Sequence, residues 1–191
     1  MIRKQKKPDP ALLADAEVMK RVRAGHTEAF SVIILRYQNS LLNFFRRLGV
    51  YTDAEDLVQE CFLRIFRNRM NYRETAKFTT FLYRVGRSVW IDWVRRQARR
   101  SSFLTEYEDG MPELNEYCER PAGSGMDAQI ALESLPEKLR LVVVMSIYQG
   151  MKYAEIAEAL DIPVGTVKSR MSIAFDLLRD YMYADAGEKK V

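Results

Sequence analysis

The sequence predicts an all-α protein built from two small helical domains that an acidic flexible linker joins. The chain has 191 residues with only 9 glycines and 6 prolines, and so low a share of helix breakers favours long helices. Apolar residues recur at spacings of three and four over roughly 11–98 and 127–183, which is the pattern of amphipathic helices. The chain shows no period-two alternation of a strand and no internal repeat.

The distribution of charge places the linker. Residues 84–100 hold six arginines and one acid, Asp92, whereas residues 105–127 hold seven acids and one arginine. The acidic stretch also contains prolines and glycines without apolar periodicity, which is typical of a linker. We therefore expect a first domain over 1–100, a linker over 101–126 and a second domain over 127–191. An ordered surface loop is the alternative for the acidic stretch.

Composition excludes several classes of protein. With 48% apolar residues the chain can bury a core. Two cysteines and a single histidine do not supply the ligands of a metal cluster. The basic start of the chain lacks the apolar segment of a secretion signal, and the aliphatic runs are far shorter than the ~20 residues that span a membrane. We expect a cytoplasmic protein with no membrane insertion, metal site or cofactor.

The segment 53–67, DAEDLVQECFLRIFR, predicts a helix with two different faces. One face is an apolar stripe for the core, consisting of Leu57, Val58, Cys61, Phe62, Ile65 and Phe66. The opposite face carries Asp56, Gln59, Glu60 and Leu63. An apolar side chain ringed by polar groups suits a protein contact, although a solvated face with one stray leucine has the same pattern. Asp56 and Glu60 lack a third ligand or a nearby histidine, which disfavours a metal or acid–base site.

Aromatic and basic residues are interleaved over 71–100. The rings are Tyr72, Phe78, Phe81, Tyr83, Trp90 and Trp93, among the cations Arg73, Lys77, Arg84 and Arg87. Such interleaving suits single-stranded nucleic acid, because rings stack on bases while cations follow the phosphates. A basic stripe of Arg84, Ser88, Arg95 and Arg99, with Asp92 among them, suits a duplex. The competing interpretation puts the rings in the core, and we expect it to hold for Phe81 and Trp93.

The segment 153–180 has the pattern of a helix-turn-helix. A short helix, YAEIAEAL, is followed by DIP and a second helix that keeps Val167, Met171, Ala174 and Leu178 as a buried seam. Its exposed first turns carry Thr166, Lys168, Ser169, Arg170 and Ser172. In a helix-turn-helix these first turns enter the major groove, where such side chains reach base edges and phosphates. Helical hairpins that bind nothing share this spacing.

Together these features resemble a bacterial RNA polymerase sigma factor of the extracytoplasmic-function (ECF) type, in the sigma-70 family. This compact class holds only the second and fourth conserved sigma domains. The resemblance covers roughly 29–100 and 127–180. DAEDLVQECFLRIF is similar to the family's polymerase-binding helix, and LPEKLRLVVVMSIYQGMKYAEIAEALDIPVGTVKSRM is similar to its promoter-reading helix-turn-helix. Both occur in the family's order, with the acidic stretch between them.

The resemblance implies a non-enzymatic specificity factor and assigns roles to residues. Its partners would be core RNA polymerase (the β′ clamp helices and the β flap), promoter DNA and an anti-sigma factor. Asp56, Gln59 and Glu60 would bind the clamp helices. We add Leu63 to this set because helix geometry places it on the same face. The −10 set would be Tyr72, Lys77, Phe78, Thr79, Arg84 and Ser88. The −35 set would be Thr166, Lys168, Ser169, Arg170 and Ser172.

The sequence departs from the family pattern in two places. The family often has Asn where Ser88 stands, so no −10 sequence is carried over. The recognition helix commonly continues with an Arg-Ala-Arg run, whereas this chain has Ile173, Ala174 and Phe175, followed by Asp176. Fewer phosphate contacts weaken binding to the −35 element and flatten its salt dependence, by ~0.7–0.9 in slope per lost contact.

Two other functions compete with this interpretation. A stand-alone helix-turn-helix regulator that binds operators as a dimer explains the second domain, but it leaves the Asp56 face and the aromatic–basic segment without roles. A nucleic-acid-modifying enzyme would need a phosphate loop or a nucleophile–base pair. The chain has its only histidine at His26 and shows neither feature.

Overall fold

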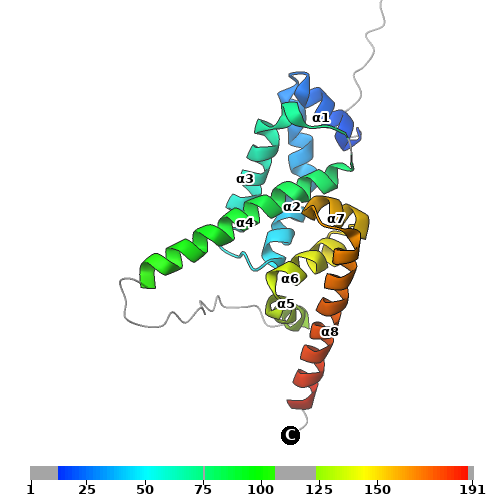
Figure 1. Ribbon diagram of the computed structural model, residues 1–191. Helices are drawn as coiled ribbons and strands as arrows, with labels where there is room; N and C mark the ends of the chain where they lie inside the picture. The colour runs from blue at the N-terminus through cyan, green and yellow to red at the C-terminus, as the bar shows by residue number, and fades with distance from the viewer. Residues whose placement is uncertain (1–12, 75, 106–123, 189–191) are drawn as a thin grey trace, which may run out of the picture.

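A computed structural model describes the backbone over residues 13–74, 76–105 and 124–188 (Figure 1). Over these ranges the chain is helical and has no strand, so the predicted all-α class is confirmed. Side chains are described over 13–74, 76–100 and 128–181. Two long helices, α4 and α8, extend away from the body of the molecule (Figure 1).

The N-terminal half contains four α-helices and two short 3-10 turns among its described residues. They are α1 (Asp15–Arg23), η2 (Thr27–Ala29), α2 (Phe30–Arg47), α3 (Ala54–Arg67), η3 (Arg69–Asn71) and α4 (Phe78–Thr105). The expected helix over 53–67 is α3. It begins after Asp53, whose side chain caps no backbone N–H of α3 and bonds to α4 instead.

The described elements of the C-terminal half are all helical. Its elements are α5 (Ser124–Ser134), α6 (Glu137–Val143), the π-helical turn η4 (Val144–Tyr148), α7 (Tyr153–Leu160) and α8 (Val164–Glu188). The chain turns between α7 and α8 at Asp161, which has a φ of 54° and lies in the left-handed region. This tight turn sets the two helices of the predicted helix-turn-helix against each other.

The predicted linker falls mostly outside the described residues. Helix α4 continues past position 100 to Thr105, and α5 begins at Ser124. Residues 106–123, which carry most of the acids of the expected linker, are not described. The division at 100 and 127 therefore stays a prediction.

Helix α4 lies close against α2 because of one glycine. A Cβ atom built on Gly86 would be 3.3 Å from the ring of Phe44 and 3.6 Å from Leu41. This is closer than an ordinary contact, so the Phe44 ring would have to shift by a few tenths of an ångström to admit a Cβ at position 86. Phe44, Leu41 and the neighbouring Leu82 are each fully buried.

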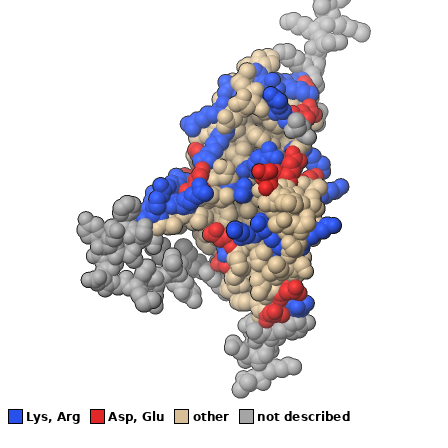
Figure 2. All heavy atoms as spheres, in the orientation of Figure 1, with Lys and Arg blue, Asp and Glu red and all other residues tan. Residues whose placement is uncertain are grey.

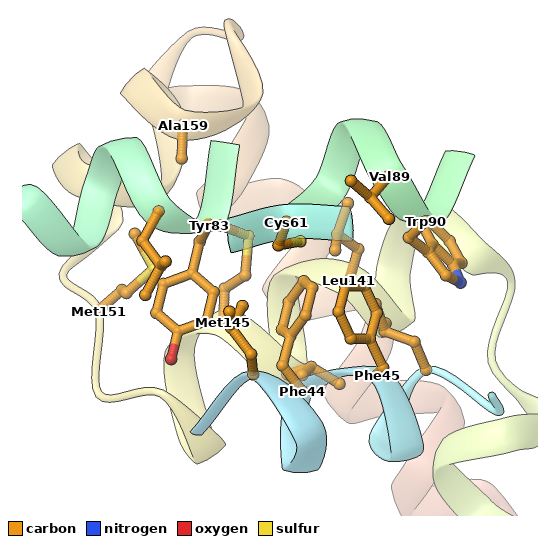
Figure 3. Packing of buried hydrophobic residues seen from close by; sticks show 14 of the residues in the cluster. Phe44, Phe45, Cys61, Tyr83, Val89, Trp90, Leu141, Met145, Met151 and Ala159 are labelled. Carbon is orange, nitrogen blue, oxygen red and sulfur yellow. The ribbon is translucent and has the colours of Figure 1, made fainter. Parts of the chain in front are cut away.

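The two halves of the chain share one continuous apolar core. Met145 of η4 and Met151 beside α7 pack with Phe44 of α2 and Tyr83 of α4 (Figure 3). All four side chains are buried. The described parts of the two predicted domains thus pack directly against each other in this conformation.

Arg140 of α6 ties the two halves together through backbone carbonyls. Its guanidinium donates to the carbonyl oxygen of Leu48 (3.2 Å) at the end of α2, and to those of Leu135 (3.1 Å) and Glu133 in its own half. Burial lowers the pKa of Arg140, because desolvation disfavours its charged form. The planar group meets several acceptors at once, which suits arginine and not lysine.

Arg140→Met is expected to lower the free energy of unfolding by about 2–3 kcal/mol, because it leaves three carbonyls without their charged donor. Urea unfolding followed by circular dichroism measures the change. The control is Lys138→Met, on the exposed side of the same helix, which should stay within about 0.5 kcal/mol of the unmodified chain. Equal effects of the two substitutions would contradict the role given to Arg140.

Candidate protein and nucleic-acid interfaces

The outer face of α3 combines acids, an amide and one exposed leucine. Asp56 and Gln59 are exposed, Glu60 is half-buried, and Leu63 has 47% of its surface exposed. The inner stripe of the same helix is buried at Leu57, Val58, Cys61, Phe62 and Ile65, with Phe66 partly buried against the core. The predicted division of α3 into a core face and a solvent face is confirmed.

Arg64 connects this outer face of α3 to α4. Its guanidinium lies 2.7 Å from Glu60 Oε1 and 2.7 Å from Asp92 Oδ2, and it also donates to Ser88 Oγ at 3.4 Å. The hydrogen bond to Glu60 is the main reason why the pKa of Arg64 is raised. Asp92, the single acid in the arginine-rich stretch of α4, therefore forms an ion pair with Arg64 of α3.

A second link fixes the start of α3 against α4. The indole Nε1 of Trp93 donates to Asp53 Oδ2 at 2.6 Å, and the Gln97 amide donates to the same oxygen at 3.2 Å. A cavity of about 400 Å³ lies between α3 and α4 beside these hydrogen bonds. It is lined by Asp53, Asp56, Leu57, Glu60, Arg64, Trp93, Arg96, Gln97 and Arg100.

The exposed side of α4 is strongly basic. Arg84 and Ser88 are exposed near its middle, and Arg95, Arg96, Arg99 and Arg100 are exposed toward its far end. Figure 2 shows blue gathered on the arm that α4 forms. Such a band attracts the phosphates of a nucleic acid.

The aromatic residues of this region are placed differently from the expectation. Tyr72, Phe78, Tyr83 and Trp90 are at most 5% exposed, whereas Phe81 and Trp93, the two expected in the core, are only partly buried. Tyr72 packs edge-on to Phe78 and tilted against Phe81, with ring centres 6.0 Å and 5.3 Å apart. Tyr72 and Phe78 thus lie under the surface in this conformation and offer no open ring face.

A small cavity opens beside this cluster of rings. It measures about 230 Å³ and is lined by Asn71, Tyr72, Arg73, Ala76, Phe81, Arg84 and Glu158. The Tyr72 hydroxyl is buried and has no hydrogen-bond partner among the described residues.

The cations at the start of α4 are paired with acids of α7. Lys77 Nζ lies 2.7 Å from Glu155 Oε1, and Arg84 lies 3.6 Å from the Glu158 carboxylate and donates to the Glu158 carbonyl at 3.0 Å. The hydrogen bond from Lys77 lowers the pKa of Glu155, and the backbone N–H of Lys152 adds to the effect. Thr79, the neighbouring residue of the predicted −10 set, is half-buried.

The second helix of the helix-turn-helix presents a short polar surface. Val167, Met171 and Ala174 are buried and Leu178 is partly buried, so the predicted seam is confirmed. The five polar residues of the first turns lie outside the core: Lys168, Ser169 and Ser172 are exposed, while Thr166 and Arg170 are half-buried. Beyond them, Ile173 and Phe175 are about half exposed.

Sequence reasoning missed several residues of these surfaces. Arg64 has a local signal, because it follows Glu60 by four residues on one helix face. No local signal in the sequence indicates the partners of Lys77 and Arg84, because Glu155 and Glu158 lie more than seventy residues away along the chain. Their pairing depends on how the two halves pack.

Two kinds of site are absent from the described residues. Over 13–74, 76–105 and 124–188, no helix is long and apolar enough to cross a membrane. The same part of the chain holds no cluster of three or more His, Cys, Asp or Glu suited to a metal ion. Cys61 is a core residue, and its burial raises the pKa of the thiol to about 12.

Comparison with known proteins identifies both halves. Residues 33–100 match the family model of sigma-70 region 2, and residues 127–176 match that of sigma-70 region 4. The ECF RNA polymerase sigma factor SigW of Bacillus subtilis is 32% identical over 174 residues, which cover 84% of this chain and 92% of SigW. The ECF RNA polymerase sigma factor SigE of Mycolicibacterium smegmatis is 37% identical over 148 residues, covering 75% of this chain and 57% of that protein.

A solved structure supports the fold. The sigma factor RpoE from Bartonella quintana, in its complex with the anti-sigma factor NepR, superposes with a TM-score of 0.67 at 20% identity. The match covers 82% of this chain and 98% of that one. An all-helical chain with a basic helix, a helix-turn-helix and these relatives is an RNA polymerase sigma factor. The chain belongs to the ECF group of the sigma-70 family.

Lys77→Met is expected to raise the pKa of Glu155 toward its ordinary value, because the largest cause of its lowering is the hydrogen bond from Lys77. A carboxylate with a lowered pKa stabilises the folded chain above its ordinary pKa, and this contribution is lost as the pH falls through the lowered value. Titration of the Glu155 side chain by NMR measures the shift. Lys152→Met is the control, because it keeps the backbone N–H bond and should move the titration less. An unchanged Glu155 titration in Lys77→Met would argue against the ion pair.

Proposed function

We propose that the chain binds core RNA polymerase through α3 and reads promoter DNA through α4 and α8. The observation that carries the proposal is the exposed acidic and apolar face of α3 lying beside the basic face of α4, with Arg64 bonded to both. One rigid unit thus offers a protein-binding surface next to a DNA-binding surface. The chain carries no bond chemistry of its own, and polymerase supplies the reaction.

The polymerase surface consists of Asp56, Gln59, Glu60 and Leu63. Exposed Leu63 lies among polar groups, which is the composition of a protein interface with an apolar centre and a polar rim. The side chain of Glu60 is already held by Arg64. A preordered side chain loses less conformational freedom on binding. We assign this surface as the binding site of the β′ clamp helices. The second domain would bind the β flap.

The −10 surface combines exposed cations with the cavity beside Tyr72. Lys77, Arg84 and Ser88 lie on the outside and suit phosphates. The cavity of about 230 Å³ is walled partly by Tyr72 and Phe81. We assign it to a base flipped out of the duplex, because stacking and hydrogen bonds there offset a flipping cost of a few kcal/mol. Phe78 and Thr79 are the first two residues of α4.

The −35 surface is the first part of α8. Lys168, Ser169 and Ser172 are exposed there, with Thr166 and Arg170 beside them. These side chains match the donors and acceptors that read base edges in the major groove. Ile173 and Phe175 stand exposed where the family commonly has arginines, so we expect few phosphate contacts from this stretch.

The organisation of the chain follows from these surfaces. We assign residues 1–100 to sigma domain 2, 101–126 to the linker, and 127–191 to sigma domain 4. The chain acts in the cytoplasm with core polymerase. An anti-sigma factor is the further partner, by analogy with the Bartonella quintana complex. The stand-alone operator-binding regulator is not favoured, because it gives no role to the outer face of α3.

Asp56→Ala combined with Gln59→Ala is expected to weaken binding to core polymerase about tenfold or more while the fold is kept, because both side chains are exposed. Fluorescence anisotropy of the labelled chain with core enzyme measures the affinity. Glu55→Ala is the matched control, since Glu55 is an exposed acid on the same helix outside the proposed surface. Unaltered affinity of a folded double variant would refute this polymerase surface.

Lys168→Ala is expected to reduce transcription about three- to tenfold from promoters with a −35 element, because it removes a groove or phosphate contact. Run-off transcription on paired templates, with and without that element, measures the effect. Arg179→Ala removes a cation from the far part of the same helix and serves as control. Equal losses on both templates would show that Lys168 does not act through the −35 element.

A further inference from the structure

The cavity of about 400 Å³ between α3 and α4, called the α3–α4 cavity below, has charges of opposite sign on its two sides. Asp53, Asp56 and Glu60 line it from the side of α3. Arg96 and Arg100 line it from the side of α4. Two of the acids, Asp56 and Glu60, also belong to the proposed polymerase surface, so the cavity is continuous with that surface.

Two of the three carboxylates are already bonded within the chain. Asp53 accepts two hydrogen bonds from side chains of α4, and Glu60 accepts one from Arg64 at 2.7 Å. No described residue forms an ion pair or a hydrogen bond with the exposed side chain of Asp56. One carboxylate at the edge of the cavity is therefore available to a cation of a partner.

The two arginines on the other side of the cavity have no carboxylate partner among the described residues. Arg96 Nε donates to the carbonyl of Asp92 in the preceding turn at 3.3 Å, and Arg100 lies four residues further along α4. Both side chains are exposed. Residues four apart share one face of a helix, so one anionic group of a partner can reach both arginines.

Two further arginines of α4 have different surroundings. Arg95 and Arg99 border a second cavity, of about 650 Å³, in which the one carboxylate is that of Asp92. The charge of Asp92 is already paired with a cation of α3. Of these two cavities, Arg100 borders the α3–α4 cavity alone, whereas Arg96 borders both. The far end of α4 thus presents two pairs of arginines, and one of them faces the acids of α3.

These surroundings favour a protein over DNA as the partner of Arg96 and Arg100. A phosphate brought to them inside the α3–α4 cavity would approach the three carboxylates there, and like charges repel. A protein segment that carries one cation and one anion matches both sides of the cavity. Leu57 and Trp93 also line it, and aromatic residues and arginines are enriched in protein interfaces.

We infer that the polymerase interface extends from α3 across the α3–α4 cavity onto Arg96 and Arg100. The occupant is the polymerase segment that binds the outer face of α3, and it presents a cation to Asp56 beside an anion for the two arginines. This inference rests on the proposed function, which assigns the outer face of α3 to polymerase. It divides the basic end of α4, because Arg95 and Arg99 are left for the phosphates of the promoter.

The test compares two double variants of the whole chain that change its net charge equally. Arg96→Gln with Arg100→Gln removes the pair at the α3–α4 cavity, and Arg95→Gln with Arg99→Gln is the matched control. All four side chains are exposed on the same helix, so both variants are expected to fold, which circular dichroism checks. Fluorescence anisotropy of the labelled chain with core polymerase, in the absence of DNA, measures the affinity.

Arg96→Gln with Arg100→Gln is expected to bind core polymerase about five- to thirtyfold more weakly than the control pair, because two interface charges are lost. Arg96→Lys with Arg100→Lys should recover most of the affinity, since it keeps both charges.

Equal affinities of the two glutamine variants, or a larger loss in the control pair, would overturn the inference and leave all four arginines to DNA. Either result would leave the proposed function standing. That function fails separately if the unmodified chain does not bind core polymerase, and the inference then fails with it.

Discussion

The core side of α4, where Gly86 leaves room for the side chains of Phe44 and Leu41, is the packing constraint that determines which face of α4 is exposed. With a Cβ at this position only 3.3 Å from Phe44, α4 lies deep enough for Tyr83, Val89 and Trp90 to be buried. The arginines of α4 occupy its exposed side. One helix therefore supplies part of the core and the whole basic band (Figures 2 and 3).

The other interfaces are built on this placement of α4. Arg64 reaches Asp92 and Trp93 reaches Asp53 only because α3 and α4 are held side by side. These contacts tie the outer face of α3 to the basic face of α4, so a shift of one helix displaces both faces. The second half uses the same helix, since Tyr83 lies in the common core and Arg84 meets Glu158. Helix α4 therefore contacts both α3 and the second half of the chain.

Local periodicity explains what the sequence could predict. The core stripe of α3 and the seam of α8 follow from apolar spacing within one helix, and Val58, Ile65, Val167 and Met171 are buried as expected. The aromatic segment shows where such reasoning ends. Composition indicates that rings and cations alternate, but packing against α2 decides which rings are buried. Tyr72 and Phe78 lie under the surface, whereas Trp93, expected in the core, is half-buried and bonded to Asp53.

The contacts between the two halves could not be predicted from the sequence, for a different reason. Ser40 on α2, Tyr83 on α4 and Gln149 just after η4 are distant along the chain. No spacing rule relates them, and the acidic stretch between the halves suggested separation. Their hydrogen bonds depend on a packing of whole helices. The ion pairs of Lys77 and Arg84 with α7 are likewise a property of the folded chain.

The central claim is that this chain gives core polymerase its choice of promoter. Transcription by core RNA polymerase of the same bacterium, on a library of promoter fragments with and without the chain, tests it most directly. The account predicts discrete transcripts that start only when the chain is present and that share two upstream elements. A chain that binds the core enzyme yet yields no such transcripts would contradict it.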